Sequence, residues 1–121
     1  MASAAFTINS TAVPQTSGNA VEVTYGSTVS LALSSTVGAV SISWAIVGVS
    51  GVSTATPTIT PAGTPLGATA TFTVCSDPGG GGGTAYGVRC RVTDGAGTIS
   101  ESFGVVGVPA TVGVVPMVAG E

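Results

Sequence analysis

The chain has 121 residues, two arginines, five carboxylates and no histidine or lysine, which gives a formal net charge of −3. Histidine is the usual proton shuttle and the commonest metal ligand near neutral pH, and a nucleic-acid backbone requires many basic side chains. Enzyme, metal and nucleic-acid functions are therefore disfavoured. Only 6% of the residues are charged, against about 25% in ordinary soluble domains.

Such a charge-poor surface repels its own copies weakly. We expect much of it to be buried in an assembly; a monomer coated with serine and threonine is the alternative. The length fits one domain, and no run reaches the roughly 18 apolar residues of a membrane helix. The first residues lack the basic and apolar regions of a secretory signal. We therefore expect a chain made and used without export, although a processed chain with an added Met1 would look the same.

Short alternating runs of β-branched residues, separated by glycine, proline and serine, predict strands along the whole chain. No segment has sustained helical periodicity, so we expect an all-β fold. A loop is expected from Cys75 to Thr84, a turn from Pro61 to Gly67, and a loop or weak edge strand from Gly48 to Thr56. The expected strands, in chain order, are Phe6–Ile8, Val21–Tyr25, Val29–Leu33, Val40–Ile46, Pro57–Thr60, Ala68–Val74, Tyr86–Val92 and Thr98–Val106.

About seven alternating strands around one tryptophan are typical of an immunoglobulin-like antiparallel Greek-key sandwich. In each strand the alternation leaves one face for the core and one for water or a partner. The expected core residues are Val23, Tyr25, Leu31, Leu33, Ile42, Trp44, Phe72, Val74, Tyr86, Val88 and Val92.

The segment Asp94–Gly97 predicts a hairpin turn, because Asp-Gly readily takes the positive φ that such turns use. A three-residue loop would place Arg91 opposite Glu101, whereas a two-residue loop would turn Glu101 inward. Burying an unpaired carboxylate is costly, so we prefer the first register or a bulge. Arg89 and Arg91 share one face of their strand. They either form a pair within the chain or bind an acidic neighbour in an assembly.

Cys75 and Cys90 match no zinc pattern, since the chain has no histidine and no CxxC. We expect two free thiols, with Cys90 as a small core residue, and leave a disulfide open. Asp77, Asp94 and Glu22 form no calcium-binding run, and Asp94 fits turn chemistry better. The five glycines Gly79–Gly83 lack the lysine of a phosphate loop. We expect no catalytic residue, no cofactor and no bound metal.

The last segment, Val105–Glu121, has no charge before its final residue. Pro109 and Pro116 exclude a helix and a central strand. We therefore expect a domain at residues 1–107 and an extended apolar tail at 108–121, packed on its own domain or on another subunit. The candidate partner-binding residues are Arg89, Arg91, Val108, Pro109, Val112, Val114, Val115, Pro116 and Met117.

The run from Tyr86 to Thr98, Tyr-Gly-Val-Arg-Cys-Arg-Val-Thr-Asp-Gly-Ala-Gly-Thr, resembles the penultimate-strand hairpin of bacterial Ig-like and polycystic-kidney-disease-like domains. Ser43-Trp-Ala45 stands where those domains carry their core tryptophan. With its apolar tail, the chain also resembles small Ig-like structural proteins of tailed bacteriophages. The resemblance covers Val21 to Val106 but departs from the family's inter-sheet disulfide, because the Val29–Leu33 strand has no cysteine.

This resemblance implies a noncatalytic virion protein, an Ig-like decoration or accessory subunit on a phage capsid or tail, assembled in the bacterial cytoplasm. Its partners would be further copies of itself or other virion proteins, with no nucleic acid and no membrane. The alternative is an Ig-like adhesion or carbohydrate-binding module. Sugar sites favour exposed aromatic residues, and the chain has only six aromatics, most of them at positions expected in the core.

Overall fold

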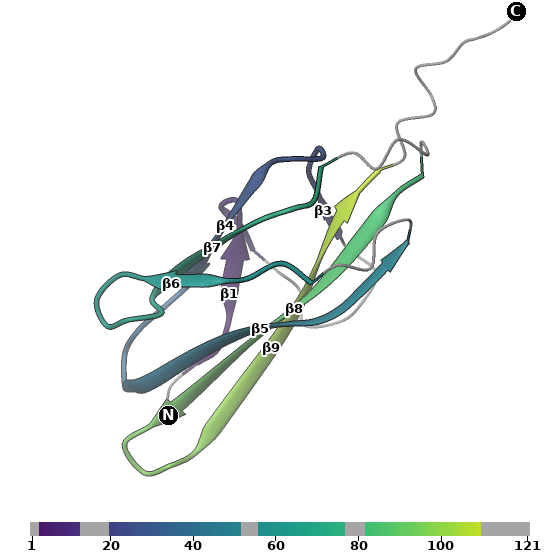
Figure 1. Ribbon diagram of the computed structural model, residues 1–121. Helices are drawn as coiled ribbons and strands as arrows, with labels where there is room; N and C mark the ends of the chain where they lie inside the picture. The colour runs from purple at the N-terminus through teal and green to yellow at the C-terminus, as the bar shows by residue number, and fades with distance from the viewer. Residues whose placement is uncertain (1–2, 13–19, 52–55, 77–81, 110–121) are drawn as a thin grey trace, which may run out of the picture.

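The structure is a computed structural model that describes residues 3–12, 20–51, 56–76 and 82–109 (Figure 1). These residues form strands and turns and contain no helix, so the all-β prediction is confirmed. The strands are β1 (Phe6–Ile8), β2 (Thr11–Ala12), β3 (Ala20–Glu22), β4 (Thr28–Leu33), β5 (Ala39–Gly51), β6 (Thr60–Ala62), β7 (Thr69–Thr73), β8 (Thr84–Asp94) and β9 (Ile99–Val108).

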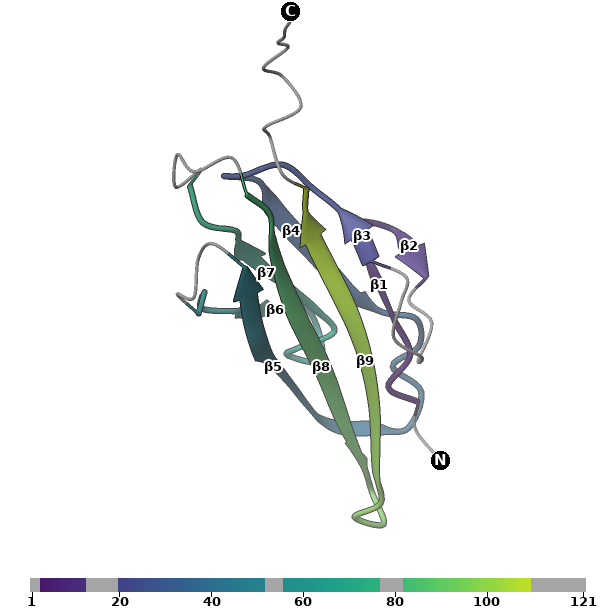
Figure 2. The ribbon, with the colours of Figure 1, turned by 90° about the vertical axis from the view of Figure 1, so that its right-hand side faces the viewer.

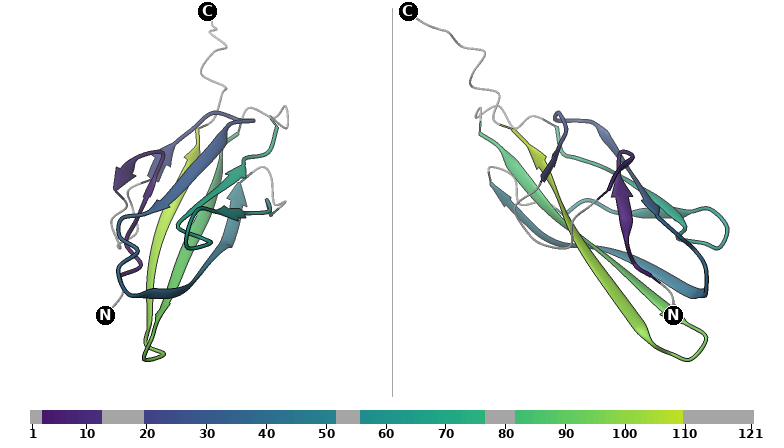
Figure 3. Two further views of the ribbon diagram at one scale, coloured as in Figure 1. Left: turned by 90° about the vertical axis from the view of Figure 1, so that its left-hand side faces the viewer. Right: turned by 180° about the vertical axis from the view of Figure 1, so that it is seen from behind.

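The strands form two sheets in a sandwich-like arrangement. One sheet has five strands in the order β2-β1-β4-β7-β6, and the other has four in the order β3-β9-β8-β5. Every pairing is antiparallel except that of β3 with β9, which is parallel. Figures 2 and 3 show β5, β8 and β9 as the long strands of one layer, with β4, β7 and β6 in the other. Buried side chains from both sheets form a single core.

The β8–β9 hairpin has the preferred register, with Arg91 opposite Glu101. Its loop is Gly95–Gly97, because the Asp94 amide donates to the Thr98 carbonyl at 3.0 Å. The residue with positive φ is Gly97, at +84°, and not Gly95, so the Asp-Gly rationale for this turn was wrong. The Asp94 carboxylate accepts the amides of Ala96 and Thr98, both at 2.9 Å, which confirms its turn role.

Three expected strands differ in place. The strand expected at Val21–Tyr25 is β3, which ends at Glu22. β5 continues to Gly51 at the edge of its sheet, so the edge-strand alternative is correct as far as that residue. The Pro57–Thr60 strand was placed too early, since β6 is Thr60–Ala62. Pro61 is tolerated there because β6 is an edge strand, where a missing amide proton leaves no ladder bond unmade.

The core contains most of the residues expected in it. Leu31, Phe72, Val74, Tyr86, Val88 and Val92 are buried, whereas Val23, Tyr25, Leu33, Ile42 and Trp44 are half-buried and pack around them. Cys90 is buried, as predicted. The further buried apolar residues are Ala4, Phe6, Ile8, Val29, Ala70, Val106 and Val108.

Val108 corrects the expected domain boundary. It is the last residue of β9, pairs with Thr84 and is only 2% exposed. The sandwich therefore extends through Val108, and this side chain is part of the core rather than the start of a tail. Burial in its own domain also removes Val108 from the candidate partner-binding residues.

Trp44 closes one side of the sandwich. Its ring meets the Phe6 ring edge-to-face, with centroids 5.1 Å apart and an interplanar angle of 85°. Its Nε1–H donates to the Gly67 carbonyl in the β6–β7 turn at 2.7 Å. One side chain thus connects β5 to β1 and to the turn of the opposite sheet.

Candidate functional site

The candidate site is the outer face of the four-stranded sheet. Along β8, buried and outward residues alternate, so that Arg89 and Arg91 point away from the core while Val88, Cys90 and Val92 point into it. The strand register places the outward residues of the neighbouring strands beside them. We define the outer face by Glu22, Ser43, Ala45, Val47, Ser50, Ala85, Gly87, Arg89, Arg91, Thr93, Ile99, Glu101, Phe103, Val105 and Gly107.

Arg91 forms an ion pair with Glu101, the residue opposite it on β9. Its Nε donates to Glu101 Oε2 at 2.6 Å. The two side chains are 42% and 33% exposed, and pairs of this kind contribute about 1 kcal/mol or less to stability. For Arg91 the pair within the chain is therefore the correct alternative, and its charge is already balanced on the outer face.

Arg89 has no such partner. It lies opposite Phe103 on one side and Ala45 on the other, and no described residue forms an ion pair with it. Its Nε is shielded from solvent and donates to no group within the described ranges. An unsatisfied buried donor costs about 1–3 kcal/mol. A carboxylate from a partner would balance the charge of this guanidinium by binding its terminal nitrogens.

Phe103 is the aromatic residue of the outer face. It is 44% exposed, whereas the other five aromatics of the chain are buried in the core or packed against it. It was not among the residues predicted from the sequence. Its position two residues after Glu101 was the available signal, because residues i and i+2 of a strand point to the same side. Arginine and aromatic side chains are the types enriched at protein interfaces.

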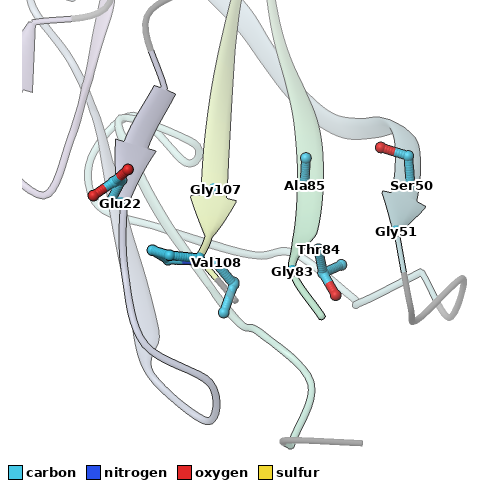
Figure 4. Close-up of a pocket in the computed structure, with 9 residues that line it drawn as sticks. Glu22, Ser50, Gly51, Gly83, Thr84, Ala85, Gly107 and Val108 are labelled. Carbon is cyan, nitrogen blue, oxygen red and sulfur yellow. The ribbon is translucent and has the colours of Figure 1, made fainter. Parts of the chain in front are cut away.

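A shallow hollow of about 280 Å³ lies where the outer face meets the end of the sheet (Figure 4). Figure 4 shows Glu22 on one side and Ser50 on the other, with Ala85 and Gly107 between them. The surface is hollow between Glu22 and Ser50 because the glycine and alanine there have little or no side chain. The lining residues are Glu22, Ser50, Gly51, Gly83, Thr84, Ala85, Gly107, Val108 and Pro109.

The remaining candidate residues are distributed differently. Pro109 is exposed and lines the hollow. Val112, Val114, Val115, Pro116 and Met117 lie outside the described residues, as does Asp77 of the rejected calcium set. Within residues 3–12, 20–51, 56–76 and 82–109, no three acidic or cysteine side chains gather closely enough to hold a metal ion. The same residues include no helix that could cross a membrane.

Both cysteines are free thiols, which confirms the preferred alternative. Cys90 is buried, and this burial raises the pKa of its thiol to about 12. Cys75 is half-buried at the end of β7, where its amide donates to the Tyr86 hydroxyl at 3.1 Å.

We expect a thiol reagent at about pH 8 to modify Cys75 and leave Cys90 unmodified in the folded chain, because only an accessible thiolate reacts. Mass spectrometry should show one adduct on the native protein and two after denaturation. The variant Cys75→Ser should show none until it is denatured. Modification of Cys90 in the native chain would contradict the burial described here.

The chain matches no protein-family model, and no curated protein or solved structure is significantly similar to it.

Proposed function

We propose that the sandwich is an immunoglobulin-like Greek key. Immunoglobulin domains place strands A, B, E and D in one sheet and C, F and G in the other. With β1 taken as A and β4 to β9 as B to G, the orders β1-β4-β7-β6 and β9-β8-β5 follow that arrangement. β3 extends the second sheet by pairing in parallel with β9.

Two side chains support this topology. Trp44 lies on β5, which corresponds to strand C, the strand that carries the core tryptophan in immunoglobulin domains. Tyr86 lies near the start of β8, and its hydroxyl accepts the amide of Cys75, which follows β7. A tyrosine at the E–F corner that hydrogen-bonds to upstream backbone is a hallmark of the fold. The pKa of Tyr86 is raised, chiefly by burial.

We propose that the chain is a noncatalytic structural subunit that docks on a larger assembly through the outer face. The observation that carries this proposal is that Arg89, which has no ion pair within the described residues, lies opposite exposed Phe103 on the outer face. The setting proposed is a phage virion, as a decoration or accessory subunit of capsid or tail. That setting derives from the resemblance of the Tyr86–Thr98 hairpin and of the tryptophan strand.

A protein partner fits the outer face better than a sugar. Carbohydrate sites converge a few aromatic and polar groups on one ligand. Five of the six aromatics belong to the core, which leaves Phe103 as the single ring available for stacking. Arg89 and Phe103, which lie opposite each other, are instead of the types enriched at protein interfaces.

The proposal predicts that Phe103→Ser releases the subunit from its assembly without unfolding it. The experiment measures the copy number of the chain, by quantitative mass spectrometry, on gradient-purified particles that encode it. We expect wild-type chain at a fixed copy number per particle, and at least about tenfold less of the variant, since an interface anchor of this kind contributes 1.4 kcal/mol or more.

The matched control is Ile99→Ser. Ile99 lies on the same strand and the same face, and it is 56% exposed, but it sits beside the β8–β9 turn, away from Arg89. It should remain on the particles. Loss of both variants, or retention of both, would contradict docking through the Arg89–Phe103 region. Particles without any wild-type chain would overturn the virion setting.

A further inference from the structure

Two charges on the outer face have no partner, and they are of opposite sign. Of the five charged side chains in the described residues, Arg91 and Glu101 pair with each other and Asp94 caps its turn. Arg89 and Glu22 remain without an ion pair among those residues. Both belong to the outer face, Arg89 on β8 and Glu22 at the end of β3.

The two charges are too far apart to neutralise each other within one chain. Glu22 lies opposite Gly107, Gly107 lies opposite Ala85, and Arg89 follows four residues later on β8. Two strand spacings of about 4.8 Å and four residues of about 3.3 Å separate their Cα atoms by about 16 Å. The register puts Val105 between them, since Val105 is opposite Gly87, midway between Ala85 and Arg89.

We propose that the outer face binds the outer face of a second copy, with Arg89 of each copy paired with Glu22 of the other. This inference rests on the proposed function and names the partner of the same face. A two-fold interface requires a patch that complements itself. One unpaired cation and one unpaired anion on opposite sides of an apolar centre satisfy that requirement. A two-fold axis that runs parallel to the sheet above Val105, at right angles to the line from Glu22 to Arg89, places each charge over the opposite charge of the other copy.

The surface between the two charges suits close packing of two sheets. Gly87 and Gly107 have no side chains, so the surface there is bare backbone and the side chains of Val105 and Phe103 project beyond it. The apolar side chain of Val47 lies over Gly87. A Cβ atom on Gly87 would be 3.2 Å from Val47 Cγ2. Stacked sheets lie about 10 Å apart, a separation that arginine and glutamate side chains span together. The proposed interface involves only a few side chains of each copy. Interfaces that small hold two copies together weakly in solution.

The test uses two charge-reversed full-length chains, Arg89→Glu and Glu22→Arg, with mass measured by sedimentation equilibrium from about 10 µM to about 1 mM, where small interfaces associate. Each variant alone places like charges in both pairing positions. We expect each to dimerise at least about tenfold more weakly than wild type, which corresponds to about 1.4 kcal/mol. An equimolar mixture restores opposite charges in both positions and should dimerise like the wild type.

Several results would overturn the proposal: a wild-type chain that stays monomeric throughout, single variants that dimerise normally, or a mixture that stays as weak as its components. The control Ser30→Glu adds an anion to the exposed side of β4 in the other sheet and should dimerise like wild type. Both single variants are at surface positions, and their circular dichroism spectra should match that of wild type. If wild type stays monomeric while Phe103→Ser still leaves the particles, the second copy is excluded and docking on a different protein stands.

Discussion

Replacing Trp44 with alanine is expected to lower the free energy of unfolding by about 3 kcal/mol, the lower end of the range for large aromatic truncations. The lower end applies because the indole is half-buried. The change removes the edge-to-face contact with Phe6 at 5.1 Å and leaves the Gly67 carbonyl without the indole N–H. Both contacts join elements that are distant in the sequence, so their loss weakens the closure of the sandwich.

The measurement is urea denaturation followed by far-UV circular dichroism, since Trp44 is the only tryptophan and its own fluorescence is lost. The comparison variant Trp44→Phe keeps a ring against Phe6 and removes the hydrogen bond. The stability that Trp44→Phe loses should include about 1 kcal/mol for the missing hydrogen bond, which is the usual net value of one such bond. An alanine variant as stable as wild type would mean that Trp44 does not connect the two sheets.

Replacing Gly67 with alanine is expected to cost about 2–5 kcal/mol, the sum of a left-handed backbone penalty and overpacking. Gly67 has φ of +97° and is buried in the β6–β7 turn. A Cβ atom there would lie 2.9 Å from Ile42 Cβ and 3.1 Å from the Ile42 carbonyl oxygen. The turn would have to move away from β5, which would also lengthen the hydrogen bond to Trp44.

Gly97→Ala is the matched control for this prediction. Gly97 has φ of +84°, but no atom lies within 4 Å of the position of its Cβ. Alanine there should cost only the backbone penalty, about 1–2 kcal/mol. The difference between the two variants, measured by urea denaturation, isolates the packing of the turn against β5. Equal losses would show that this packing does not constrain Gly67.

The sequence predicted what depends on local alternation. β8 has the expected faces because its apolar and polar side chains alternate, and the three-residue loop sets the register of β9 against it. The faces of β9 follow from that register and not from its own side chains, since Ile99 and Phe103 point outward and Ser102 is buried. Sheet order is not local, so two features remained hidden. Trp44 is half-buried because β5 is an edge strand, and Gly67 is constrained by Ile42, which precedes it by 25 residues.

The candidate site was predicted in part. Arg89 and Arg91 were placed on one face, but only the geometry separates paired Arg91 from unpaired Arg89. The hairpin register already places Phe103 beside Arg89, whereas Glu22 joins them only once β9 is known to lie between β8 and β3. The parallel pairing of β3 with β9 has no signature in a three-residue strand, so no sequence pattern could bring Glu22 to this face.

The most direct test of the claim that two copies of the chain associate through their outer faces is a dilution series of amide spectra. The ¹⁵N-labelled chain would be compared at about 1 mM and about 20 µM, a range in which weak dimers dissociate. We predict that the shifts that change belong to β8 from Ala85 to Arg91, to Phe103–Gly107 of β9 and to β3. Changes confined to the free edge of β5 or to the five-stranded sheet, or identical spectra at both concentrations, would contradict the claim.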